Sequence, residues 1–129
     1  MANRINISSG SPYEPIFGFS RAVKVNNQVF ISGCTAIQSD GTVAGTGDPH
    51  AQALKALETI KNVLAEAGGT MADVVRTRIY VTSVDYFDDV AKAHASYFSA
   101  IRPASTGVAV SALAHPDLLV EIEADAVIG

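Results

Sequence analysis

The chain has 129 residues, which suits one domain with a substantial core, and we expect a single domain over residues 1–129. Hydrophobic residues make up 48% and charged residues 17%, and the net charge of −4 is scattered without the basic stripe typical of nucleic-acid binding. The single cysteine, Cys34, excludes an internal disulfide. Because no secretory signal or ~18-residue apolar membrane span is visible, we expect a cytoplasmic protein.

The first quarter of the chain predicts three strands. Residues 4–7 form a short strand candidate, and the Ser-, Gly- and Pro-rich stretch 8–15 is expected to be a loop. Residues 18–25 and 28–33 predict a hairpin around two asparagines. In the first strand of this hairpin, the period of two places four side chains on one face: Phe19, Arg21, Val23 and Val25.

Residues 48–69 carry the clearest helix signal. Asp48 suits the N-cap and Pro49 the first helical position, while Gly68 and Gly69 end the segment. Its apolar stripe consists of Leu54, Leu57, Ile60, Val63, Leu64 and Ala67.

The second half of the chain predicts a strand, a helix and two more strands. We expect a strand over 73–82, a helix over 84–101 capped by Asp85, and strands over 106–111 and 118–127. We also expect the last two strands to pair antiparallel. In the strand 73–82, alternation separates Val75, Thr77, Ile79 and Val81 from Val74, Arg76, Arg78 and Tyr80.

This order of elements predicts an α+β domain with one mixed sheet and two helices on one of its faces. The other face of the sheet then needs cover, and a second subunit is a natural source of it in so apolar a chain.

Three carboxylates share one face of the last strand: Glu121, Glu123 and Asp125. This face is either solvated or part of an interface, or one carboxyl lines a site as a proton donor or acceptor. Arg76 and Arg78 allow two similar interpretations, as partners of these carboxylates or as an anion clamp.

The remaining polar groups predict no metal site. His50, His94 and His115 are scattered, so no metal-ligand spacing appears, and no histidine lies in a recognisable nucleophile motif. We expect His94 to be a satisfied core or interface residue and Cys34 to be a small buried hydrophobe.

Four blocks resemble the reactive-intermediate deaminase superfamily, also called Rid or YjgF: "QVFISG" (28–33), "ALETIKNVLAEAGGTMADVVRTRIYVTSVDYF" (56–87), "RPAS" (102–105) and "VEIEADAV" (120–127). The resemblance implies a chorismate-mutase-like α+β domain in a barrel-like homotrimer, with ligand clefts between subunits. Its best-known members hydrolyse enamines and imines such as 2-aminoacrylate, without a cofactor.

The residues of the family's cleft are only partly kept. The hallmark arginine after "PA", which grips the substrate carboxylate, is Ser105 here, and the cysteine two residues on is Gly107. The tyrosine of the second strand is Phe19, and a polar residue of the second helix is Ala91. The glutamate of "EIEA", here Glu121, is kept together with Ser32 and Gly33.

The resemblance therefore implies a cleft lined by Ser105, Thr106 and Gly107. This cleft should be wider and less electropositive than the arginine-bearing cleft of the family. Three functions remain open. The first is hydrolytic deamination or water addition on a small imine, enamine or carbonyl compound, with Glu121 catalytic and Arg21 as a substitute anchor. The second is a non-catalytic ligand-binding or regulatory trimer. The third is RNA cleavage or translation inhibition, the source of the endoribonuclease L-PSP label, against which the acidic balance argues.

Overall fold

Six strands form one mixed sheet in the computed structural model, which describes residues 3–129. In space the strands follow the order β1-β2-β3-β6-β4-β5, and among these described strands only β4 and β5 pair in parallel. In chain order they are β1 (Arg4–Ile7), β2 (Ala22–Val25), β3 (Gln28–Cys34), β4 (Val74–Val81), β5 (Ala104–Ala109) and β6 (Val120–Val127).

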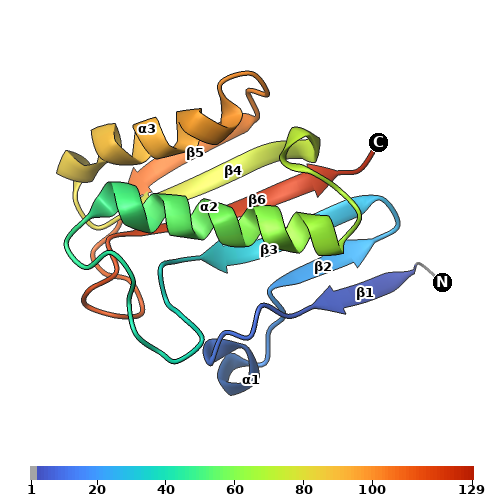
Figure 1. Ribbon diagram of the computed structural model, residues 1–129, viewed down its shortest axis with the longest axis horizontal. Coiled ribbons are helices and arrows are strands. Elements are labelled where there is room, and N and C mark those ends of the chain that lie inside the picture. Colours follow the sequence, from blue (N-terminus) through green and yellow to red (C-terminus); the bar gives the residue numbers. More distant parts are fainter. Residues whose placement is uncertain (1–2) are drawn as a thin grey trace.

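The two long helices, α2 (Pro49–Glu66) and α3 (Phe87–Phe98), cover the same face of the sheet (Figure 1). α2 lies over β3 and β6, and α3 lies beside it over the β4–β5 edge (Figure 1). The short helix α1 (Tyr13–Phe17) lies beyond the end of β1, and two 3₁₀ turns, η1 (Met71–Asp73) and η2 (Val84–Tyr86), precede β4 and α3. The α+β fold expected from the sequence is confirmed.

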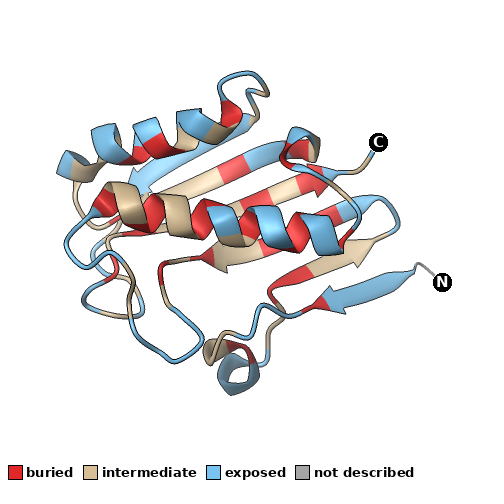
Figure 2. Cartoon of the chain, in the orientation of Figure 1, coloured by how far each residue is buried: buried red, intermediate tan, exposed pale blue. Residues whose placement is uncertain are grey.

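The start and end of α2 follow the sequence signals. The Asp48 carboxylate accepts a hydrogen bond from the Ala51 amide at 3.0 Å, which satisfies one of the free N–H groups of the first turn. Beyond its C-terminus, Gly68 has φ +90°, a conformation that glycine reaches at little cost. The apolar stripe of α2 packs on the sheet (Figure 2). Leu54 is partly buried, and the other five residues of the stripe are buried.

Alternation along β6 also holds. Four apolar side chains of β6 are buried under the helices, whereas Glu121, Glu123 and Asp125 lie part-exposed on the opposite face. The four buried residues are Val120, Ile122, Ala124 and Ala126.

The alternation expected for β4 is wrong at its first two residues. β4 pairs Val74 with Ala126 but Arg76 with Asp125, so an irregularity in the pairing lies at Val75. A bulge adds one residue to the strand, so the alternation of side chains before it is reversed. Val74 is therefore buried and Val75 is 47% exposed.

The boundaries of four elements differ from the expectation. The stretch 8–15 is not all loop, since α1 begins at Tyr13, and β2 begins only at Ala22 because Gly18 closes α1 in a left-handed conformation. α3 begins at Phe87 after η2, and Ser83, not Asp85, caps that turn by accepting from the Asp85 amide at 3.2 Å. The strand expected over 106–111 is β5, two residues earlier.

The expected pairing of the last two strands is wrong. β6 lies between β3 and β4, antiparallel to both, and β5 pairs with the far side of β4. The unit β4–α3–β5 is a crossover between parallel neighbours, which leaves the gap between β3 and β4 for the returning chain. Across the range 3–129, no helix has both the length and the apolar run needed to cross a membrane.

Candidate functional site

A pocket of about 530 Å³ opens between α1, α2, the end of β3 and the segment before β2. Its lining includes five residues from the ends of strands or the loops beside them: Phe19, Arg21, Gly33, Cys34 and Glu121. We call these five residues the pocket floor.

A β-bulge shapes the floor. β3 pairs Ile31 with Ala124 and resumes at Cys34 opposite Ile122, so Ser32 and Gly33 together lie opposite one residue of β6. The Ser32 amide donates to the Arg21 carbonyl at 2.8 Å, and its hydroxyl donates to the Ser20 carbonyl at 2.7 Å. The "SG" of the resemblance is therefore the bulge that connects β3 to the segment carrying Arg21.

Gly33 is the residue type that the floor requires. A Cβ at this position would lie 1.9 Å from Glu121 Oε2 and 2.8 Å from its Cδ. The carboxyl of Glu121 thus rests directly against the backbone of the bulge, and any side chain at position 33 would displace it.

Arg21 is buried, with 6% of its surface exposed. Its Nε donates to Ser9 Oγ at 3.0 Å, its Nη1 donates to the Gly33 carbonyl, and its guanidinium carbon lies 5.4 Å from the centre of the Phe19 ring. Among the residues that the structure describes, Nη2 has no hydrogen-bond partner, which leaves one donor edge of the guanidinium for a ligand.

A second carboxylate, that of Glu14, is connected to Arg21 through Ser9. Glu14, 6% exposed, accepts hydrogen bonds from the amide and hydroxyl of Ser9 at 3.1 and 2.9 Å and from the Ser11 amide at 3.1 Å. Burial raises the pKa of Glu14, but the hydrogen bonds from serines together lower it by more, so the pKa lies below its ordinary value. The Ser9 hydroxyl therefore links the Glu14 carboxylate to the Arg21 guanidinium.

Sequence reasoning missed Glu14 and Ser9. The spacing of Ser11 and Glu14, a serine followed three residues later by a glutamate, is a helix-start signal that could have located α1. It could not have indicated that the carboxylate is buried against the segment carrying Arg21.

Glu121 is the uncommitted acid of the site. Burial raises its pKa, Arg21 lowers it and Glu123 raises it, and the net shift is upward. No hydrogen bond to its carboxyl is found within residues 3–129. A carboxyl whose pKa is moved toward neutrality and whose oxygens are free can both donate and accept a proton.

Cys34 is a structural residue, as expected. It is 1% exposed, and burial raises the pKa of its thiol to about 11, although Arg21 acts in the opposite direction. The thiol stays protonated at neutral pH and is not an activated nucleophile.

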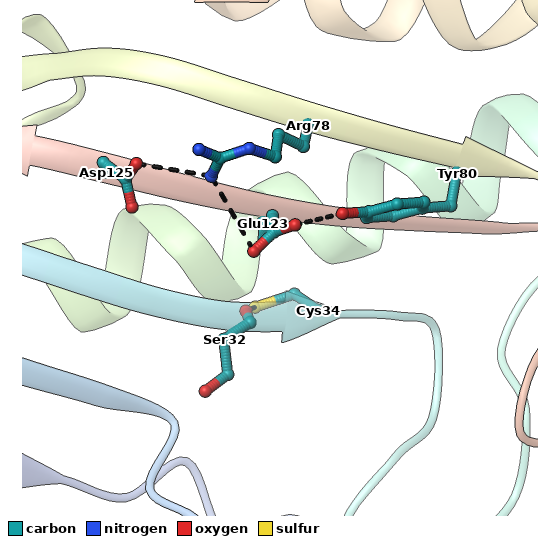
Figure 3. A network of polar contacts seen from close by, with 6 residues as sticks. All are labelled: Ser32, Cys34, Arg78, Tyr80, Glu123 and Asp125. Carbon is teal, nitrogen blue, oxygen red and sulfur yellow. Dashed lines mark hydrogen bonds and ion pairs between the residues drawn. The ribbon is translucent and has the colours of Figure 1, made fainter. Parts of the chain in front are cut away.

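The other two carboxylates of β6 are committed to partners on β4 (Figure 3). The Tyr80 hydroxyl donates to Glu123, and this hydrogen bond is the main cause that raises the pKa of Tyr80. Arg78 Nη1 lies 3.4 Å from Asp125 Oδ2 and 4.0 Å from Glu123 Oε2 (Figure 3). The interpretation of this face as paired charges therefore fits Arg78.

Ser105 and its two neighbours lie on the edge strand β5. Thr77 Oγ1 donates to Ser105 Oγ at 2.8 Å and lies 2.8 Å from His94 Nε2. A Cβ at Gly107 would lie 3.0 Å from the Phe87 ring. The small side chains at 105 and 107 thus make room for α3, which packs His94 and Phe87 onto this edge.

His94 fits the expected structural role. It is half-buried, its ring lies 4.6 Å from that of Phe98, and burial lowers its pKa. In the part of the chain that the structure describes, no group of three or more His, Cys, Asp or Glu side chains is placed to hold a metal ion.

Comparison with known proteins decides the family. The model of the family "Endoribonuclease L-PSP" matches residues 10–128. The chain belongs to the Rid/YjgF superfamily.

Two solved structures of this superfamily show the same fold. The chain is 46% identical to Rv2704 of Mycobacterium tuberculosis, a member of the YjgF/YER057c/UK114 family, with a TM-score of 0.87 over 98% of this chain and 100% of that one. It is 32% identical to YyfA of the Rid family from Yersinia pestis, with a TM-score of 0.86 over 98% of this chain and 100% of that chain. Among curated relatives, it is 34% identical to the 3-aminoacrylate deaminase RutC of Acinetobacter baylyi over 95% of both chains.

Within one chain of this Rid/YjgF protein, the predicted site residues fall into two groups. Phe19, Arg21, Gly33 and Glu121 line the pocket together, and Ser32 belongs to the bulge beneath them. The run 105–107 lies apart from Glu121, because β4 separates β5 from β6.

Proposed function

We propose that this Rid/YjgF protein is a cofactor-independent hydrolase. It adds water to a small imine, enamine or carbonyl metabolite and releases ammonia when the substrate carries nitrogen. The observation that carries the proposal is the free Glu121 carboxyl, with its raised pKa, beside the buried guanidinium of Arg21. The relative named 3-aminoacrylate deaminase supports the same class of reaction.

Glu121 has the chemistry for both proton transfers. In its neutral form it donates a proton to the imine nitrogen, which makes the imine carbon more electrophilic. The resulting carboxylate accepts a proton from the attacking water, and the new C–O bond gives an amino alcohol. Return of that proton to the amine allows the C–N bond to break and ammonia to leave. The Glu121 carboxylate then accepts the hydroxyl proton as the C=O bond of the carbonyl compound forms, which restores the neutral acid.

Arg21 supplies the anchor in place of the family's arginine. Its Nη2 can donate to a carboxylate or carbonyl oxygen of the ligand, while Ser9 and Gly33 hold the other two nitrogens. Because two of the three nitrogens are already engaged, only one nitrogen is left to bind the ligand, whereas a bidentate pair uses two. We therefore expect activity on 2-aminoacrylate to be weak or absent, since Ser105 has neither the charge nor the reach of an arginine.

We also propose a homotrimer. Both long helices lie on one face, so neither covers the opposite face, which carries Arg78, Glu123 and Asp125 (Figure 1). A neighbouring subunit over this face could bring its run 105–107 toward the pocket floor and so complete a cleft between subunits.

Three substitutions on one strand face test the role of Glu121. Glu121→Gln keeps the size of the side chain and removes its titration, so kcat/KM should fall by about a hundredfold or more. Glu123→Gln and Asp125→Asn are matched controls, because their carboxylates are committed to Tyr80 and Arg78. Imines generated in situ by an amino-acid oxidase, with semicarbazide as a competing trap, supply the assay.

Undiminished turnover by Glu121→Gln would refute the assignment.

A second function is favoured by the loss of the hallmark arginine at Ser105. If the unaltered protein binds a 2-oxo acid and hydrolyses none of the imines, it is a ligand-binding or regulatory protein.

A further inference from the structure

The pocket is large for a three-carbon substrate. Its volume of about 530 Å³ falls within the ~300–1,000 Å³ range of clefts that enclose drug-sized ligands. A 2-aminoacrylate-sized molecule held at Arg21 and Glu121 would leave most of this space to water. The space beyond the pocket floor therefore needs its own explanation.

One wall of that space is aromatic and apolar. Tyr13 and Phe17 of α1 stand edge to face, with ring centres 5.9 Å apart, and Ile37 lies in the loop after β3, which a bridge to Val43 holds in place. Phe17 is 72% exposed although it lines a pocket. An aromatic ring left uncovered at the mouth of a cleft gains most from an apolar ligand group.

The opposite wall is a polar stripe of α2. Lys55, Thr59, Asn62 and Glu66 recur at the three- and four-residue spacing of one helix face, and all four line the pocket. Within the described residues, the side chains of Lys55, Asn62 and Glu66 have no hydrogen-bond or ion-pair partner. Because covering unpaired polar side chains with an apolar group would cost their hydration, an apolar group is better placed on the α1 side.

We propose that the pocket holds 2-oxo acids, and the corresponding 2-imino acids, that carry a bulky apolar side chain, with Phe17, Tyr13 and Ile37 forming the side-chain subsite. This inference rests on the proposed function and names its substrate class. The ligand carboxylate lies at Arg21, its C2 atom lies beside Glu121, and its side chain packs against the Phe17 ring.

Phe17 and Ile16 provide a matched pair for the test. They are neighbours on α1, each is 72% exposed, and only Phe17 lines the pocket. Neither substitution removes a buried contact, so Phe17→Ser and Ile16→Ser should both fold. Isothermal titration of the full chain with pyruvate and phenylpyruvate measures the contribution of the side-chain subsite.

Phenylpyruvate should bind about tenfold more tightly than pyruvate, the gain expected from burying one ring face. Phe17→Ser should reduce this ratio to less than about threefold with pyruvate affinity unchanged, and Ile16→Ser should keep it. Equal affinity of the unaltered protein for the two acids, no saturable binding of phenylpyruvate, or an equal loss in both variants would overturn the inference.

Failure of the subsite and failure of the chemistry give different results. A protein that prefers phenylpyruvate but hydrolyses none of the imines has the subsite without the proposed reaction. A protein that hydrolyses small imines, with no preference between the two acids, has the reaction without the subsite.

Discussion

Substitution of Gly33 by alanine should impair the site with little effect on the fold. The added Cβ would lie 1.9 Å from Glu121 Oε2, so that oxygen must retreat by at least about 1 Å to reach the closest distance that real contacts allow. Gly33 does not use the left-handed backbone region, so alanine fits its backbone without strain. The perturbation therefore acts on the Glu121 carboxyl.

The expected loss can be estimated from this displacement. A misplacement of about 1 Å in a reacting group costs about a hundredfold in rate, which corresponds to about 2.7 kcal/mol of activation free energy. Glu121 is half-buried beside an open pocket and can swing into it, so the free energy of unfolding should change by less than about 1 kcal/mol.

A double-substitution cycle separates this mechanism from a general disturbance. kcat/KM is measured with the oxidase-generated imines for Gly33→Ala, Glu121→Ala and the double variant. If the effect of the added methyl passes through Glu121, it should be absent in the Glu121→Ala background. A Gly33→Ala protein as active as the unaltered one, or an equal loss in both backgrounds, would refute the reasoning.

Three further predictions concern stability and assembly. Gln52→Leu should lower the free energy of unfolding by about 3 kcal/mol in urea, because the buried amide serves the Gly45 and Asp117 carbonyls and the Leu119 amide; a loss below about 1 kcal/mol would contradict this. Glu14 has a lowered pKa in the folded state, so its contribution is present above its ordinary value of 4.5 and is lost as pH falls through the folded-state pKa. Glu14→Gln should therefore lose stability at pH 7 and show a flatter acid decline, and a decline as steep as that of the unaltered chain would count against this role. Light scattering at micromolar concentration should give about three times the chain mass, and a monomer there would remove the proposed trimer.

Local signals were sufficient for most elements. Asp48 and Pro49 located the start of α2 and the glycines its end, because a helix terminus is decided by the few residues that satisfy its free backbone groups. Alternation separated the buried residues of β6 from Glu121, Glu123 and Asp125, since successive side chains of any strand point to opposite faces.

The same local patterns failed where the chain departs from regular geometry. The bulge at Ser32–Gly33 and the irregular pairing at Val75 each change which side chains share a face, and no periodicity marks them beforehand. Glu14 was predicted to lie in a loop, yet three hydrogen-bond donors on its own chain segment allow it to be buried.

The sequence by itself determined most of the elements and the acidic face of β6. It also predicted site residues: Phe19, Gly33 and Glu121 through the resemblance, and Arg21 through the strand face it was expected to share with Phe19. Only the tertiary structure decided that β6 enters between β3 and β4, which brings Glu121 to the bulge and leaves Ser105 on the far edge. Strand order depends on contacts between distant segments, and their free energy includes packing and loop closure that no short stretch of sequence contains.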